Sequence, residues 1–207
     1  MAAIRSAVRQ ADVYVFTLGL TECWRNLKTG LEYALCPGTT AGTEFDAKLH
    51  GFHNTSVSEV AADLEAALAG LHRENAELKI LLTVSPVPLV ASASGAHVLT
   101  ATSHSKSVLR AVAGETAARL EGVDYFPSYE IITHPIFRGM FFASNMRSVE
   151  AQGVDTVMGH FFAEQARVFG PQKPAKKAPK AKGKKGKATA LSSDVKCEEE
   201  LLGAFQK

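Results

Sequence analysis

VYVFTLGLTECW, residues 13–24, is the stretch that indicates the fold class of this 207-residue chain. Its first half, Val13–Leu18, is β-branched and aromatic and runs straight into a glycine, which is typical of a buried parallel strand that ends in a loop. In open α/β sheets, ligands bind just beyond the carboxyl ends of the strands. We therefore expect Thr21 and Glu22 to lie where a functional site forms.

The rest of the first 170 residues predicts strands that alternate with helices. Apolar runs predict strands at Leu78–Val84 and Val123–Phe126. Apolar residues at helical spacing predict helices at Ala2–Gln10, from a capping box at Ser56 to about Glu74, at Ser103–Leu120 and at Val149–Val168. Residues 26–54 are typical of a long connection that lines or covers a pocket. Strands separated by helices predict βαβ units and a parallel sheet.

Charge and composition divide the chain into a domain and a tail. Residues 171–207 hold ten lysines and four acidic residues, whereas the rest of the chain holds 13 basic and 17 acidic residues. Residues 1–169 therefore predict one domain, and residues 170–193 a disordered linker rich in lysine, alanine and proline. Residues 194–207 predict a short amphipathic helix that Asp194 caps.

The same composition argues against several classes of protein. No apolar run approaches the roughly 20 residues that span a bilayer, and three cysteines without metal-ligand spacing favour reduced thiols in the cytoplasm. His50 and His53 have no convergent cysteine or carboxylate pattern, so we expect no metal, and no motif calls for a cofactor. The basic tail lacks aromatic residues for base stacking, so we expect a solvated linker rather than a nucleic-acid tether.

Four motifs in a fixed order resemble those of one family. They are Thr17-Leu18-Gly19-Leu20-Thr21-Glu22, Thr83-Val84-Ser85-Pro86-Val87-Pro88-Leu89, Ser105-Lys106-Ser107-Val108-Leu109-Arg110 and Tyr125-Phe126-Pro127-Ser128-Tyr129-Glu130. This series resembles the GSCFA-domain family, a branch of the SGNH hydrolase superfamily, over nearly all of residues 1–165. The resemblance implies a flavodoxin-like, three-layer αβα fold with a parallel sheet, and hydrolysis of a small acyl ester or acylated carbohydrate.

The resemblance also implies where the site residues lie. Members of the superfamily carry a serine nucleophile after the first strand, oxyanion donors after the next two strands, and an Asp-x-x-His pair near the carboxyl end. Residues 19–22 fall where the superfamily has its Gly-x-Asn-Asp block. By this resemblance Gly19 lines the pocket, Thr21 donates to the oxyanion through its hydroxyl, and Glu22 braces the loop.

The chain departs from this pattern at two catalytic elements. The segment that carries the family's serine is absent, because its place would precede Met1, so we expect a domain that is truncated at its start and lacks its first strand or strands. Asn145 and Ser148 stand in the Asp and His positions, and neither is a general base near neutral pH. His134 is either a replacement base or an ordinary loop histidine. His104 does not form a catalytic pair with its neighbouring serines, since adjacent helix residues do not face each other, and it is either a capping or surface residue or a compensating base.

Two readings of the function remain open at this point. The first is an ester hydrolase domain that is inactive as this chain. The second is a non-catalytic binding module, or a truncated remnant, that needs a partner or self-association at an exposed sheet edge. Ser85 and Ser128 either line the pocket or set the turns at the strand exits. Trp24 and Phe52 either pack the long connection over the pocket or belong to the core.

Overall fold

The computed structural model describes residues 2–39 and 44–170 of the chain. A three-stranded parallel sheet forms its centre, with strands β1 (Val13–Leu18), β4 (Lys79–Val84) and β5 (Val123–Tyr125) in the order β1-β4-β5. Helices connect these strands, so the parallel α/β arrangement expected from the sequence is confirmed. The disordered linker and the short helix expected within residues 171–207 lie outside the described residues.

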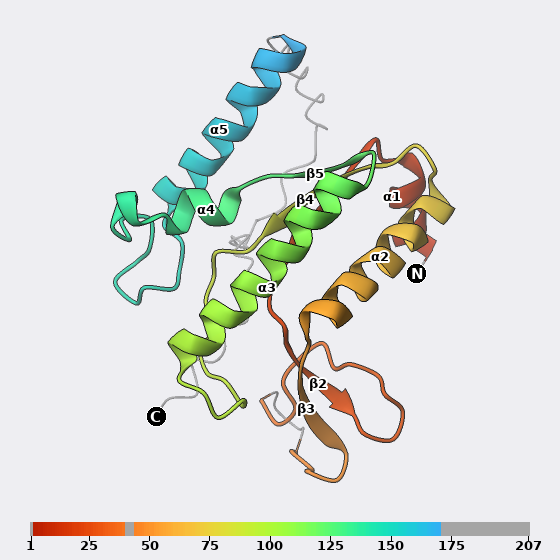
Figure 1. Ribbon diagram of the computed structural model, residues 1–207, viewed down its shortest axis with the longest axis vertical. Coiled ribbons are helices and arrows are strands. Elements are labelled where there is room, and N and C mark those ends of the chain that lie inside the picture. Colours follow the sequence, from red (N-terminus) through yellow and green to blue (C-terminus); the bar gives the residue numbers. More distant parts are fainter. Residues whose placement is uncertain (1, 40–43, 171–207) are drawn as a thin grey trace, which may run out of the picture.

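Three helices pack on one face of this sheet, namely α1 (Ala2–Gln10), α2 (Val57–Glu74) and α3 (Val98–Arg119) (Figure 1). Alternate residues of each strand point to this face. They meet apolar side chains of the three helices in one core, which includes Val8, Leu64, Leu68, Ile80, Leu82, Val84, Val108 and Val112. The core therefore lies between the sheet and these helices.

The start of α2 carries the predicted capping box. Ser56 Oγ accepts a hydrogen bond from the Glu59 N–H, and the Glu59 carboxylate accepts one from the Ser56 N–H. Two backbone donors that the helix cannot satisfy internally are thus satisfied. Val60, Leu64 and Leu68 follow at helical spacing and are buried, as the apolar stripe predicts.

The chain after β5 reaches the opposite face of the sheet. Two short elements, α4 (Ser128–Thr133) and the 3-10 helix η1 (Pro135–Phe137), lead into the long helix α5 (Ala151–Phe169). Figure 1 shows α5 standing apart from α2 and α3 at the upper end of the molecule. None of the helices in the described part of the chain combines the length and the apolar content that a membrane span requires.

Side chains of β5 and α3 anchor α4. The Glu130 carboxylate of α4 accepts hydrogen bonds from the Arg110 guanidinium of α3 and from the Tyr125 hydroxyl of β5. The Arg110 guanidinium also lies 4.1 Å from the centre of the Tyr125 ring. Burial, followed by the hydrogen bond to Glu130, raises the pKa of Tyr125 above its usual value. This cluster fixes the corner where the chain leaves the carboxyl end of β5.

A hairpin replaces part of the expected long connection. Strands β2 (Glu22–Asn26) and β3 (His50–Asn54) pair antiparallel, with Trp24 opposite Phe52, and project beyond α2 and α3 (Figure 1). Six of the ten paired residues, Asn26 and His50–Asn54, fall within residues 26–54, so the interpretation of those six as an irregular connection is wrong. Neither ECWRN nor HGFHN carries an apolar alternation, so the signal arises only when the two pair across 23 intervening residues. The Trp24 ring packs against the ring of Phe52 at 5.7 Å.

Two further expectations need correction. Helix α3 begins at Val98, five residues before the expected Ser103, because the His97 side chain accepts a hydrogen bond from the Leu99 N–H and caps the helix. Strand β1 is not buried on both faces, since Val13 is 54% and Val15 is 56% exposed. Both side chains lie on the face opposite the core helices α1–α3, and β1 stands at the edge of the described sheet.

Candidate functional site

The loop that follows β1 lies at the carboxyl edge of the parallel sheet. The N–H of Ser85, the first residue after β4, donates to the Leu18 carbonyl over 2.9 Å. The Lys106 ammonium of α3 donates to the Gly19 carbonyl over 2.7 Å. A neighbouring strand and a core helix therefore both fix the point where β1 ends.

Thr21 joins this loop to two other elements. The residue is 2% exposed; its N–H donates to Ser105 Oγ of α3 over 2.8 Å, and its hydroxyl donates to Asn54 Oδ1 of β3 over 2.7 Å. Its carbonyl accepts the Thr55 N–H over 2.8 Å. Both donors of Thr21 are thus used within the protein. Thr21 as an oxyanion donor stays a prediction, and it requires one of these bonds to exchange for a ligand.

Ser105 and Lys106 place polar groups on the buried side of α3. Ser105 is 0% and Lys106 is 2% exposed. A buried ammonium is costly unless hydrogen bonds compensate it, and the bond to the Gly19 carbonyl contributes to that compensation. The Lys106 side chain therefore holds a hydrogen-bond donor against the loop after β1.

Glu22 connects the hairpin to the segment that precedes α3. Its Oε1 accepts a hydrogen bond from the Ser92 hydroxyl over 2.6 Å. Ser92 belongs to the connection between β4 and α3, which leaves the same edge of the sheet. The carboxylate therefore holds two loops of the candidate site together.

The two serines after β4 and β5 bond mainly to backbone. Ser85 Oγ accepts the Val87 N–H over 3.3 Å. Ser128 Oγ donates to the Val84 carbonyl over 3.1 Å and lies 2.5 Å from Thr83 Oγ1. Both side chains thus set the geometry of the strand exits at the carboxyl edge.

Asn145 and Ser148 form a local turn at this edge. Asn145 Oδ1 accepts the N–H groups of Arg147 and Ser148 over 2.9 and 3.0 Å, and its Nδ2 donates to Ser148 Oγ over 2.9 Å. The Arg147 guanidinium donates to the Pro88 carbonyl over 3.2 Å, so the turn lies against the segment after β4. The structure therefore places both positions beside the segment after β4, with each bonded to the other.

The histidines engage other partners. His134 is exposed, and its Nδ1 accepts the Ile136 N–H over 3.3 Å at the start of η1. His53 Nε2 lies 2.9 Å from Glu59 Oε1, and His50 Nδ1 accepts the Asp46 N–H. Within residues 2–39 and 44–170, no serine hydroxyl bonds to a histidine ring, and no three metal-ligating side chains come together.

Glu59 is the carboxylate with the most strongly shifted pKa in this region. Hydrogen bonds from the Ser56 N–H and hydroxyl, followed by the nearby His53, lower the pKa of Glu59 to about 2. The group therefore stays ionised through the neutral and mildly acidic range. Its partners belong to the helix cap and the hairpin, so we assign it to local structure rather than to proton transfer.

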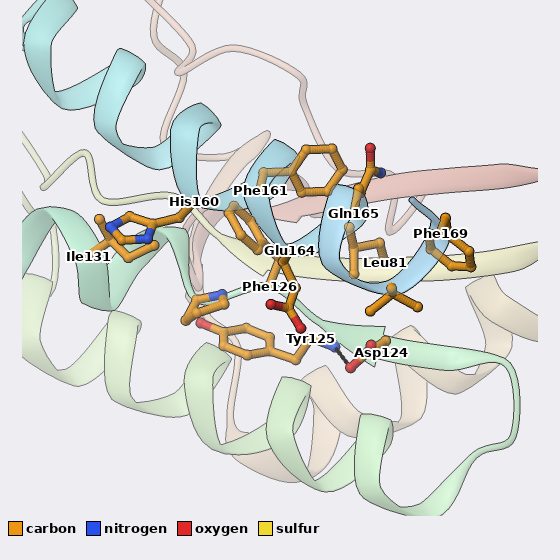
Figure 2. Close-up of a pocket in the computed structure, with 12 residues that line it drawn as sticks. Leu81, Asp124, Tyr125, Phe126, Ile131, His160, Phe161, Glu164, Gln165 and Phe169 are labelled. Carbon is orange, nitrogen blue, oxygen red and sulfur yellow. Dashed lines mark hydrogen bonds between the residues drawn. The ribbon is translucent and has the colours of Figure 1, made fainter. Parts of the chain in front are cut away.

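A hollow of about 640 Å³ lies on the open face of the sheet, beneath α5. Figure 2 shows Phe161, Gln165 and Phe169 of α5 around it, across from Leu81 and Phe126. Its walls are mainly apolar, and the Glu164 carboxylate at its rim forms an ion pair with Arg167. No serine, threonine or cysteine is among the residues that line the hollow, which lies against the face of the sheet, apart from the loop after β1.

Sequence reasoning missed three residues of the site, namely Asn54, Ser105 and Lys106. Asn54 reaches Thr21 only through the hairpin, which the sequence did not predict. The sequence does carry a signal for Ser105. This residue falls at helical spacing with the buried apolar residues of α3, such as Val108 and Val112, where an apolar side chain would ordinarily stand. A polar residue at such a position indicates a buried polar contact.

Two comparisons with known proteins bear on this arrangement. The model of the GSCFA family matches residues 1–161 of the chain, which is nearly the whole of the part described above. A search of the curated proteins gives no match.

Proposed function

The chain belongs to the GSCFA family, and from this premise we propose that the carboxyl-edge loop is an ester-hydrolase-type site that binds its ligand without hydrolysing it. Family membership suggests a hydrolase-like domain. The ligand of this proposal is a small acyl ester or an acylated carbohydrate. No further cofactor enters the proposal.

The observation that supports this proposal most is the way the loop after β1 is held. Ser105, Lys106 and Asn54 fix it through the Thr21 N–H, the Gly19 carbonyl and the Thr21 hydroxyl. An ordered loop binds a ligand at a lower entropic cost than a mobile one, and binding through Thr21 exchanges one of these hydrogen bonds for a bond to the ligand. A Cβ at Gly19 would meet no atom within 4 Å, so there is space beside the loop.

The absence of hydrolysis follows from the side chains at the expected base positions. A general base must lie about 2.6–3.2 Å from the proton it removes and must titrate near the working pH. Asn145 does not titrate, and Ser148 accepts its hydrogen bond. Nucleophile and base act as a unit, and loss of either costs on the order of 10⁶ in rate in a serine protease.

A second candidate function is a binding module that works with a protein partner. The exposed Val13 and Val15 on β1 favour it, because apolar residues on an edge strand are typical of a surface that another chain covers. This candidate and the first agree that the chain alone performs no ester hydrolysis.

An esterase assay tests the proposal. We expect the purified full chain to hydrolyse p-nitrophenyl acetate no faster than the Thr21→Ala and His134→Ala variants, which all match the buffer rate at neutral pH. A saturable rate that falls in His134→Ala would instead assign His134 as a replacement base and contradict the proposal. Thr21→Ala then shows whether the Thr21 hydroxyl takes part in that activity.

A further inference from the structure

The peptide group between Gly19 and Leu20 is held from one side by α3. The Gly19 carbonyl accepts a hydrogen bond from Lys106 Nζ over 2.7 Å, and Lys106 is 2% exposed on the buried side of the helix. The described residues contain no cis peptide bond, so this peptide is trans and its N–H points opposite to its C=O. Because the C=O points towards α3, the Leu20 N–H points away from it.

This N–H lies where a ligand can reach it. Gly19 is exposed, and Leu20 is 43% exposed. Within residues 2–39 and 44–170 the Leu20 N–H donates to no protein group, whereas the neighbouring Thr21 N–H donates to Ser105 Oγ. A ligand can therefore bind to the Leu20 N–H without breaking a hydrogen bond of the described protein.

The residue that precedes this N–H leaves space for a ligand. Gly19 does not have a positive φ, so its backbone conformation does not require glycine. A Cβ at this position would also meet no atom within 4 Å. Neither backbone strain nor crowding accounts for a glycine here, and a missing side chain lets another molecule approach the backbone closely.

We propose that the Leu20 N–H binds the acyl carbonyl oxygen of the ligand, and that Lys106 is the positioning residue that orients this N–H. The inference rests on the proposed function, because it names the donor at that same site. Hydrogen bonds in a chain polarise one another, so the bond from Lys106 to the Gly19 carbonyl also strengthens the Leu20 N–H as a donor. Binding in this way leaves both hydrogen bonds donated by Thr21 intact.

Hydrogen exchange of the ligand-free chain tests the geometry on its own. We expect the Leu20 amide to exchange rapidly, because it is exposed and has no acceptor within the described residues. The Thr21 amide is buried and bonded to Ser105, so we expect it to be protected. A Leu20 amide that is as well protected as the Thr21 amide would overturn the inference.

A chemical-shift titration of the full chain with an O-acetylated methyl glucoside tests the donor. We expect the Leu20 amide proton to move downfield until the site is saturated, while the Thr21 amide stays protected from exchange. Shifts at Gly19 and Asn54 without a shift of the Leu20 proton would overturn this inference and leave the proposed function standing. The absence of any shift would overturn both.

The Lys106→Met variant tests the positioning role. We expect the Leu20 amide proton of the ligand-free variant to move upfield, because the peptide group is less polarised, and the ligand affinity to fall about tenfold. Lys79→Met is the matched control, since Lys79 is exposed at the start of β4, at the opposite edge of the sheet, and we expect neither change. Lys106→Met and Lys79→Met variants that behave alike would overturn the positioning role.

The Gly19→Val variant tests the same site with the Lys106 side chain left in place. A branched side chain beside the Leu20 N–H fills the space that the ligand needs, so we expect at least about a tenfold loss of affinity. This variant keeps the inference falsifiable if Lys106→Met does not fold. Wild-type affinity in a folded Gly19→Val variant would overturn the assignment of the Leu20 N–H.

Discussion

Leu82→Ala lowers the free energy of unfolding by about 2–5 kcal/mol, the largest effect that we expect of a single substitution in this chain. Leu82 is 0% exposed and stands on the central strand, with Phe16 of β1 and Tyr125 of β5 as its register partners. Its side chain belongs to the core between the sheet and α1–α3. Truncation removes buried apolar contacts and leaves a cavity that fixed strands on both sides cannot close.

Urea denaturation measures this loss, with Leu99→Ala as the control. Leu99 is 71% exposed on α3, so its truncation removes little buried surface and changes the free energy of unfolding by about 0.5 kcal/mol or less. A loss below about 1 kcal/mol in Leu82→Ala would contradict the position of the core in this fold.

Ser105→Ala destabilises the protein by about 1–3 kcal/mol and loosens the candidate site. The Ser105 hydroxyl accepts the Thr21 N–H over 2.8 Å, and both residues are buried. Alanine leaves that N–H without its acceptor and out of reach of water, which costs the desolvation of the group. We also expect the Thr21 amide to exchange its hydrogen faster than in the wild type.

Ser107→Ala is the matched control for this change. Ser107 lies two residues further along α3 and is exposed, so the same substitution removes no buried partner. Urea denaturation and amide hydrogen exchange of the two variants distinguish a loss of helix stability in α3 from a loss of order in the loop after β1. If both variants behave alike, Ser105 does not hold the loop after β1.

The elements that the sequence predicted well are those with a strong local signal. The strand at Val13–Leu18 and the helix at Ala2–Gln10 have the predicted bounds, and the capping box at Ser56 marks the start of α2. The β2–β3 hairpin and the six-residue α4 were missed. Their residues acquire structure from partners distant in sequence, which local periodicity does not record.

The exposure of β1 shows a second limit of what a sequence pattern predicts. A β-branched and aromatic run such as Val13–Leu18 has the same pattern whether its strand lies inside a sheet or at an edge. Only the strand order β1-β4-β5 reveals the open side. The sequence therefore predicts the type of the element, and the neighbours of the element determine how much of it is buried.

The candidate site was predictable at the strand ends and not beyond them. Gly19, Thr21, Ser85 and Ser128 lie at the carboxyl edge because parallel strands end together there. The partners that fix the loop come from α3 and β3, at separations of 84 and 33 residues from Thr21. Contacts at such separations follow from the tertiary fold alone.

Amide chemical-shift mapping with an O-acetylated methyl glucoside tests whether the loop after β1 is a binding site. We expect saturable shifts at Gly19, Thr21 and Asn54, with no release of acetate during the titration. Shifts confined to Phe126 and Phe161 would place the ligand in the hollow beneath α5 instead. That result, or the absence of any shift at millimolar ligand, would exclude the loop after β1 as the binding site.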